Sequence, residues 1–287
     1  MKHFILTIIS LICLLIAAGC EKAPAAGEDE VTEAIIPVLP ADPQPENTSF
    51  QHRILLLQHT GTACPNCPRL MESLKALSLD QSYSAKYHHV ASHSYNADDP
   101  AYTQAAKNLS QAYCSGYYPE LTFNLTKENT GVSTSVETIK EHIDALHKNS
   151  AEVGITAAAQ LTGKMLGVNV GIKTAVNGNY RISAWVLEDG IAAKQDGANE
   201  EWMHTHNNAV RIMAGKTINT KINGEKVGDL EAGKTLELPI SIELEDGWKG
   251  ENCKVIVIVT TANSEGRFDL VNCAVCPVNG NIEYKYN

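Results

Sequence analysis

The sequence predicts an α/β layer domain followed by an all-β antiparallel sandwich, both preceded by an export signal. Three features of the sequence underlie this prediction. Strand and helix patterns alternate from Arg53 to Asn149, apolar residues recur at every second position after Ser150, and an apolar run ends just before Gly19-Cys20. The 287 residues are enough for two ordinary domains. A formal net charge of −10 argues against nucleic acid as a partner.

Residues 1–19 have the pattern of a secretory signal peptide, with Lys2 near the start and an apolar run from Phe4 to Ala18. The run is short for a membrane-spanning helix, which favours cleavage. Ala17-Ala18-Gly19-Cys20 resembles a lipobox, so we expect Cys20 to be acylated and to anchor the protein to a membrane. Residues 20–51 are rich in Ala, Pro, Glu and Asp, and this composition predicts a flexible tether.

Residues 52–150 are predicted to form the α/β domain. Ile54 to Leu57 is a short apolar run, typical of a strand that is covered on both faces. Apolar residues at helical spacing, or a composition that favours helix, predict helices over Arg69–Leu79, Pro100–Tyr113 and Val136–His147. We expect Asp98 or Asp99 to cap the second of these helices. Tyr87–His93 and Leu121–Leu125 are the remaining predicted strands.

Residues 151–287 are predicted to form an immunoglobulin-like β-sandwich, because several short alternating runs follow one another without a helix. Asn177-Gly178 lies between two such runs and predicts a hairpin turn. The last two runs, Val255–Val259 and Phe268–Val275, are expected to pair as a hairpin across Asn263 to Gly266.

Cys64-Pro65-Asn66-Cys67 lies between the first predicted strand and the first predicted helix. The start of a helix offers unpaired N–H groups and a partial positive charge, which favour a thiolate over a thiol. This placement predicts that Cys64 attacks disulfides and that Cys67 resolves the mixed disulfide. A structural disulfide is the alternative, because a CxxC motif alone is weak support for redox chemistry.

With these residues the N-terminal half resembles the thioredoxin-like superfamily. The resemblance implies Cys64 as nucleophile, Cys67 as resolving cysteine and Pro119 as a cis-proline that faces the cysteines. Two positions depart from the superfamily's pattern. Ala63 stands where Trp usually precedes the first cysteine, and no residue is a certain match for the buried aspartate of thioredoxin.

A second resemblance spans both halves and rests on three motifs: residues 58–68 (QHTGTACPNCP), 185–191 (WVLEDGI) and 206–211 (HNNAVR). They look like the signatures of a family of bacteroidete lipoproteins that is named for a twenty-eight-kilodalton outer-membrane protein. This resemblance implies a thioredoxin-like first domain, a β-rich second domain and residence at the outer membrane. It implies neither a reaction nor a substrate.

The leading hypothesis is therefore thiol–disulfide exchange with envelope proteins that carry thiols or disulfides, without a cofactor. A second hypothesis is a non-catalytic lipoprotein whose sandwich binds a protein or a glycan. Metal delivery, with His59 near the cysteines, is a third, although no residue set predicts a metal site. We interpret the histidines at positions 88, 89, 93, 204 and 206 as strand-end, surface or packing residues.

Six cysteines follow Cys20, and in an exported protein such residues are interpreted first as disulfides. We expect Cys253 to bond with Cys276, or failing that with Cys273, because the final hairpin brings its two ends together. Cys114 is predicted either to approach Cys64 or to be a buried free thiol.

Overall fold

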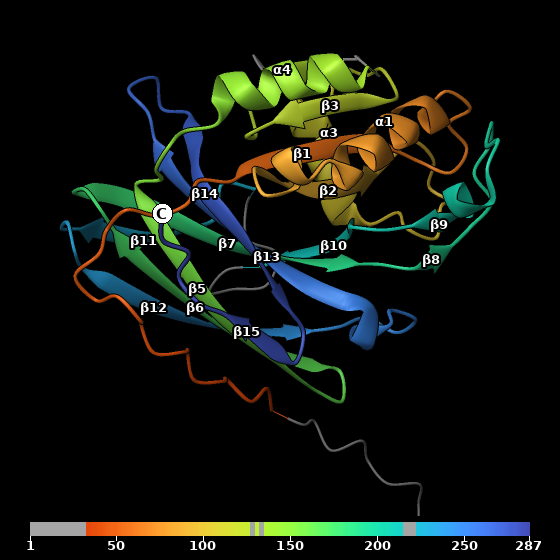
Figure 1. Cartoon of the computed structure of the whole chain (residues 1–287). Coiled ribbons are helices and arrows are strands. Elements are labelled where there is room, and N and C mark those ends of the chain that lie inside the picture. Colours follow the sequence, from red (N-terminus) through yellow and green to blue (C-terminus); the bar gives the residue numbers. More distant parts are fainter. Residues whose placement is uncertain (1–32, 127–129, 132–134, 215–221) are drawn as a thin grey trace, which may run out of the picture. The chain divides into compact units, whose positions relative to one another are not determined.

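The computed structural model describes residues 33–126, 130–131, 135–214 and 222–287, which belong to one compact unit, Thr32–Asn287. The described residues form mostly β-structure, with a few helices and three sheets (Figure 1). The predicted signal peptide and Cys20 lie outside the described residues. Within the described ranges, none of the helices is both long and apolar enough to cross a membrane.

The helices of the N-terminal half cover both faces of strand β1 (Ile54–Thr60). On one face, Leu70, Leu74 and Leu77 of helix α1 (Cys67–Leu79) pack with Ile54 and Leu56. On the other face, helix α3 (Gln104–Tyr113) packs against Leu55 and Leu57. The helices are α1 (Cys67–Leu79), α2 (Gln81–Ser84), α3 (Gln104–Tyr113) and α4 (Val136–Leu146). The predicted α/β alternation is present in this half.

One nine-stranded sheet contains strands from both halves of the sequence, in the order β14-β13-β7-β10-β2-β1-β3-β4, with β11 paired to β7. Its members besides β1 are β2 (Tyr87–His93), β3 (Glu120–Phe123), β4 (Thr130–Gly131), β7 (Gly178–Glu188), β10 (Ala209–Ala214), β11 (Glu225–Leu230), β13 (Cys253–Ala262) and β14 (Phe268–Pro277). The halves join where β10 runs parallel to β2 at Ala209 and Ala91. The predicted domain boundary near residue 150 therefore does not interrupt this sheet.

A four-stranded antiparallel sheet packs against the C-terminal part of the large sheet (Figure 1). Its strands are β12 (Thr235–Glu243), β6 (Met165–Thr174), β5 (Val153–Thr162) and β15 (Gly280–Ile282). The apolar side chains that alternate along β6 and β13 fill the space between the sheets. This period-two pattern is the one that predicted a sandwich.

The predicted hairpin at Asn177-Gly178 is wrong. Strand β6 pairs with β5 and β12, whereas β7 pairs with β10, β11 and β13. Tyr180 and Ile182 of β7 belong to the same buried core as Val170 and Ile172 of β6. The chain therefore crosses from one sheet to the other at this turn, because the apolar faces of the two sheets have to cover each other.

The prediction of a flexible tether is also wrong for its described part, residues 33–51. The ammonium group of Lys173, a residue only 1% exposed, binds Asp42 Oδ2 at 2.9 Å and the carbonyl oxygens of Gln44 and Pro45. Phe50 is fully buried beside the rings of Tyr284 and Tyr286. A buried charge needs such partners, so this segment is part of the folded unit.

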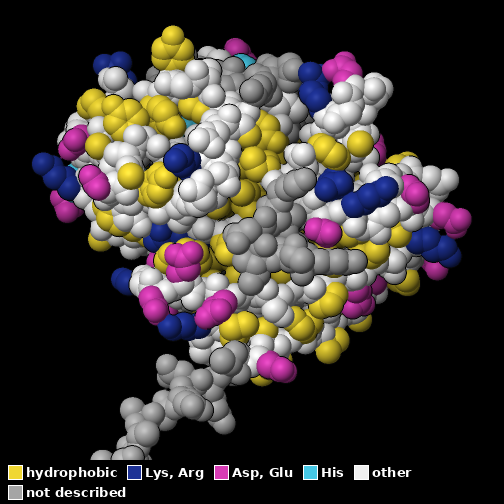
Figure 2. Space-filling model, turned by 180° about the vertical axis from the view of Figure 1, so that it is seen from behind, with side chains coloured by type: hydrophobic (Ala, Val, Ile, Leu, Met, Phe, Trp, Pro, Cys, Tyr) yellow, Lys and Arg dark blue, Asp and Glu magenta, His cyan; other side chains and the backbone are white. Residues whose placement is uncertain are grey.

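Acidic and basic side chains are interspersed on the face that Figure 2 displays, and Lys and Arg do not gather there into one tract. The remaining short elements are a two-stranded sheet of β8 (Ile191–Ala192) and β9 (Thr205–His206) and the 3-10 helices η2 (Glu201–His204) and η3 (Gly250–Asn252). The segment between β8 and η2 contacts the loop of the cysteine motif, and it brings the C-terminal half to the candidate site.

Candidate functional site

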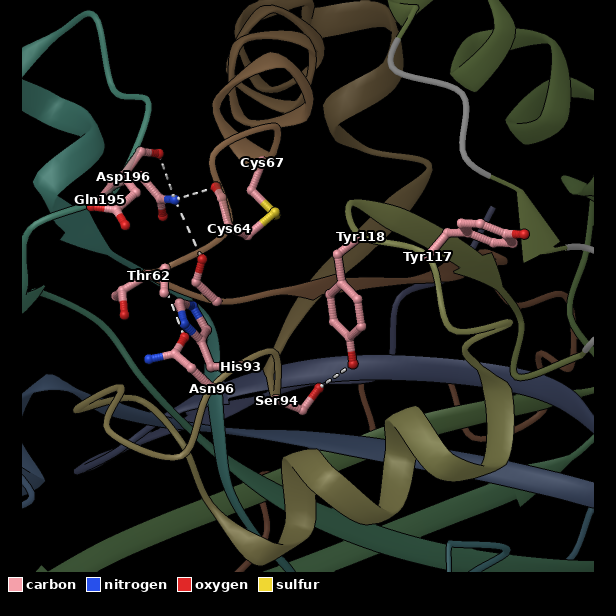
Figure 3. The surroundings of a disulfide bond; sticks show 12 residues. Thr62, Cys64, Cys67, His93, Ser94, Asn96, Tyr117, Tyr118, Gln195 and Asp196 are labelled. Atoms are coloured by element: carbon pink, nitrogen blue, oxygen red, sulfur yellow. Dashed lines mark hydrogen bonds between the residues drawn. A yellow bond between two sulfur atoms is a disulfide. The ribbon is translucent and has the colours of Figure 1, made fainter.

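Cys64 and Cys67 form a disulfide, with their Cα atoms 5.4 Å apart (Figure 3). Three residues separate the end of buried strand β1 from Cys64, and Cys67 is the first residue of α1. Asn66 makes no side-chain capping hydrogen bond, and the first turn of α1 contains no acidic residue. The positive end of the helix is thus not neutralised by its own side chains, and the sulfur atoms lie close to it.

The segment after β2 holds the cysteine loop from one side. The backbone N–H of Thr62 donates to Asp99 Oδ2 at 2.8 Å, and that of Ala63 donates to Asn96 Oδ1 at 3.2 Å. Asp99 was expected as a possible cap of α3. Thr103 has that role instead, because its side chain accepts a hydrogen bond from the N–H of Ala106.

Asp99 is a buried acid beside the cysteine loop, and it pairs with His93 at 2.8 Å between Asp99 Oδ2 and His93 Nδ1. Burial by itself would raise the pKa of Asp99. The hydrogen bonds from His93, Ala101 and Thr62 outweigh it and hold this pKa at about 2. The sequence offered no certain match for a buried acid near the cysteines, and in the structure Asp99 is a buried acid that contacts the backbone of the cysteine loop.

The segment after β8 holds the loop from the other side, although it belongs to the C-terminal half. Gln195 Nε2 donates to the carbonyl oxygen of Cys64 at 2.9 Å and lies 3.3 Å from that of Gly61 (Figure 3). The N–H of Asp196 donates to the carbonyl oxygen of Thr62 at 2.8 Å. Sequence reasoning missed these residues, since Gln195 follows Cys64 by 131 positions.

Pro119 is among the predicted site residues, and the Tyr118–Pro119 peptide bond is cis, as expected. Tyr118 belongs to the surroundings of the disulfide, and its hydroxyl group lies 3.1 Å from Ser94 Oγ (Figure 3). Its ring packs against that of Tyr95, with the centroids 5.2 Å apart. Pro119 thus begins the connection into β3, where the sequence placed it.

Both cysteines are covered in the oxidised state. Cys64 is 1% exposed and Cys67 is fully buried, whereas Pro65 and Asn66 between them are exposed. Exposure therefore does not distinguish an attacking from a resolving cysteine. Their positions in the chain do distinguish them, because Cys64 precedes the helix and Cys67 lies within it.

A family model described as outer membrane protein Omp28 matches residues 106–278, more than half of the sequence. The chain belongs to the Omp28 outer membrane protein family. The match begins after the cysteine motif and includes Pro119 and Gln195.

Two solved structures resemble this Omp28-family chain. HBP35 of Porphyromonas gingivalis has a TM-score of 0.66 at 15% identity, and the match covers 81% of this chain and 77% of that one. Protein AGR_C_4864 of Agrobacterium tumefaciens has a TM-score of 0.50 at 14% identity, and the match covers 80% and 96% of the two chains. At these identities the similarity concerns the fold. No curated protein matches the chain.

The three motifs that carry the resemblance to the Omp28 family meet in space. The N–H groups of Asn208 and Gly190 donate to Asp189 and Asn207, so the second and third motifs interlock. Their strands are also joined by a buried ion pair, 2.7 Å between Arg211 Nε and Glu188 Oε2. The first motif reaches this cluster through His89, whose ring nitrogens contact Gln58 and Asn208.

The predicted Cys253–Cys276 bond is absent, and Cys253, Cys273 and Cys276 are buried free thiols. Cys276 lies opposite Val255 on the paired strands, so Cys253 is its diagonal neighbour. Diagonal neighbours are about 7–8 Å apart, beyond the range of a disulfide. Cys273 lies opposite Ile258, still farther along the hairpin.

Cys114 is also a free thiol, and it is partly exposed. Its Sγ hydrogen-bonds with the backbone of Tyr117 and Gly116, within its own loop. Burial, together with a hydrogen bond to Glu120, raises the pKa of Cys114 to about 12. Burial likewise raises the pKa of Cys253 to about 12 and that of Cys276 to about 11. None of these three thiols has the acidity of an attacking cysteine.

Three histidines near the site, His59, His93 and His206, are buried and hydrogen-bonded. His59 is fully buried between Ser110 Oγ and Thr122 Oγ1, on the face of β1 that α3 covers. Burial lowers the pKa of His59, and also that of His206, to about 4. In the described part of the chain, no group of three or more His, Cys, Asp or Glu residues is arranged to hold a metal ion.

Proposed function

We propose that this Omp28-family protein is a lipid-anchored envelope protein whose thioredoxin-like half exchanges thiols and disulfides. The position of the Cys64–Cys67 pair supports this function most strongly. The pair lies between a buried strand and the uncapped start of α1. The helices on both faces of β1 agree with the same architecture.

The chemistry follows from these two sulfur atoms. In the reduced protein, the Cys64 thiolate attacks one sulfur of a partner's disulfide, forms a mixed disulfide and releases the partner's other sulfur as a thiolate. The Cys67 thiolate then attacks Cys64 Sγ and releases the partner's second thiolate. Two electrons pass to the partner, and the two protons of the original thiols end on its sulfurs. The oxidised pair accepts electrons from a partner dithiol by the reverse sequence.

The partner is an envelope protein with thiols or a disulfide, and it has to reach Cys64 Sγ. That atom is covered in the oxidised state, while the neighbouring Pro65 and Asn66 are exposed. Exchange therefore requires a small displacement of the loop or of the residues that cover it. Attack at Cys67 would require the first turn of α1 to open.

The test is to trap the mixed disulfide. Cys67→Ser should leave the attack by Cys64 intact and block release, so disulfide-linked partners accumulate and can be captured from envelope extracts. Cys64→Ser should trap nothing. The comparison is made in a Cys114→Ser background, which removes the one free thiol that is not buried among the described residues. Equal trapping by the two variants, or none by Cys67→Ser, would contradict exchange through Cys64.

Burial of both cysteines favours a second candidate, a non-catalytic binding lipoprotein in which the bond is structural. The bond would then fasten the start of α1 to the end of β1, and a protein or glycan would bind elsewhere. Under this alternative, reduction lowers stability and no partner is trapped. Substitution of Cys64 and Cys67 by Ser together would leave binding intact.

The outer-membrane assignment of the family agrees with an anchor at Cys20. We expect Cys20→Ser to abolish metabolic labelling by a radioactive fatty acid and to release the protein from the membrane fraction. Acyl chains hold a protein firmly only when more than one is present. Full labelling of the Cys20→Ser variant would rule out this anchor, and Cys114→Ser is the matched control.

A further inference from the structure

Gln195 contacts the carbonyl groups that close two successive turns, one that leads into Cys64 and one that joins Cys64 to Cys67. The carbonyl oxygen of Gly61 accepts from the N–H of Cys64 at 3.1 Å, and that of Cys64 accepts from the N–H of Cys67 at 3.2 Å. The side-chain amide nitrogen of Gln195 lies within 3.3 Å of both oxygens. One buried amide thus links the backbone of the motif to a segment of the C-terminal half.

Two neighbours of Gln195 contact the same loop. The N–H of Asp196 binds the carbonyl oxygen of Thr62. Gly197 has a φ of +73°, and a Cβ at that position would lie 2.2 Å from the carbonyl oxygen of Pro65. The backbone of this segment therefore lies directly against the motif, with no space for a side chain at position 197.

The chemistry of the glutamine side chain is specific to this place. Gln195 is 1% exposed, and its Oε1 is one of two buried side-chain atoms in the described residues without a hydrogen-bond partner. An unpaired buried acceptor destabilises a fold. The residue is nevertheless oriented so that its N–H donors face three carbonyl oxygens, those of Gly61, Cys64 and Asp196. A glutamate here would place oxygen against oxygen.

We propose that Gln195 is a positioning residue of the Cys64–Cys67 pair and stabilises its oxidised form. Once the S–S bond opens, only the backbone keeps the two sulfur atoms close together. By fixing the turn over Gly61 to Cys64, Gln195 raises the effective concentration of one thiol near the other, and so favours closure of the bond. Its role in catalysis rests on the proposed function, but its effect on the equilibrium exists even if the bond is structural.

The effect is measured by equilibrating the full-length protein with mixtures of reduced and oxidised dithiothreitol. Each protein disulfide that is reduced converts one dithiothreitol to its cyclic disulfide. Gln195→Met keeps the size of the side chain and removes both the donors and the unpaired oxygen. We expect it to shift the equilibrium about tenfold toward the dithiol, which for a two-electron couple is about 30 mV. Asn199→Ala is the control, because Asn199 lies on the same segment and, among the described residues, its side chain hydrogen-bonds only to Glu72 at the surface.

Coupling is reciprocal, so reduction should loosen the segment that holds the loop. In the wild-type protein, we expect hydrogen exchange at the N–H of Asp196 to accelerate at least tenfold when the disulfide is reduced. This second measurement decides the matter if Gln195→Met does not fold. The positioning role would be overturned if the disulfide–dithiol equilibrium constant of Gln195→Met lay within twofold of that of Asn199→Ala. It would also be overturned if the N–H of Asp196 exchanged at the same rate in the oxidised and the reduced protein.

Failure of this inference and failure of the proposed function are distinguishable. If Cys67→Ser traps no partner but Gln195→Met still shifts the equilibrium, exchange is rejected and the positioning role stands. If partners are trapped through Cys64 but Gln195→Met does not shift the equilibrium between the disulfide and the dithiol, the proposed function stands and the positioning role of Gln195 is rejected.

Discussion

At the scale of single residues, the chemistry of the site depends on buried polar groups whose partners come from distant segments. His93 and Asp99 are almost completely buried, and Asp99 accepts hydrogen bonds from the backbone of the cysteine loop and of Ala101. Asp99 therefore connects the end of β2 to the loop that carries Cys64. Its ionised form is the one that these contacts stabilise.

This leads to a prediction about acid stability. The pKa of Asp99 is about 2 in the folded protein, below its ordinary value of 3.8. The contribution of ionised Asp99 to the free energy of unfolding is therefore present above pH 4 and is lost as the pH falls through 2. Asp99→Asn should lower the free energy of unfolding by on the order of 2 kcal/mol at pH 5. The difference from wild type should shrink toward pH 2. Urea unfolding at several pH values measures it, and a difference that stays constant from pH 5 to pH 2 would contradict the assignment.

Some of these residues were predictable and others were not. Cys64 and Cys67 were found because a CxxC after an apolar run lies within a short window, and Pro119 was carried over from the resemblance to the thioredoxin-like superfamily. Gln195 and the contacts of Asp99 had no local signal. A glutamine in a polar loop has the same appearance whether it is exposed or, as here, bonded to the backbone of a segment 131 positions away.

At the scale of elements, periodicity was a good guide to helices and strands and a poor guide to their pairing. Strand β2 has the bounds that the sequence predicted, Tyr87–His93, and α4 ends within one residue of its predicted limit. The turn at Asn177-Gly178 nevertheless joins two sheets, because the choice of partner strand depends on the core. The pairing of Cys253 was wrong for the same reason, since register is not readable from the alternation alone.

The segment 33–51 yields a prediction at this scale. Asp42→Ala removes the only carboxylate that pairs with the buried Lys173 ammonium among the described residues. Breaking a buried ion pair at one partner costs on the order of 3 kcal/mol, so we expect a loss of that size in thermal or urea unfolding. Asp246→Ala is the control, because its ion pair with Lys164 is exposed and should contribute less than about 1 kcal/mol. Equal effects of the two substitutions would mean that residues 33–51 do not stabilise the fold.

At the scale of the whole molecule, the candidate site is a product of both halves. The large sheet continues from β1 and β2 into β10 and β7, and the segment after β8 returns to hold the cysteine loop. The two fold types were predictable from the change of period near residue 150. Their common sheet was not, because it depends on a single parallel contact between distant strands, at Ala91 and Ala209.

The reduction potential of the Cys64–Cys67 pair tests the central claim most directly. Full-length protein is equilibrated with dithiothreitol or glutathione redox buffers, and the oxidised fraction is read by alkylation of free thiols and mass spectrometry. Redox-active exchange predicts a potential between about −270 and −120 mV, the range of known exchange proteins. A potential below about −300 mV, typical of structural disulfides, would contradict exchange and would favour the binding lipoprotein.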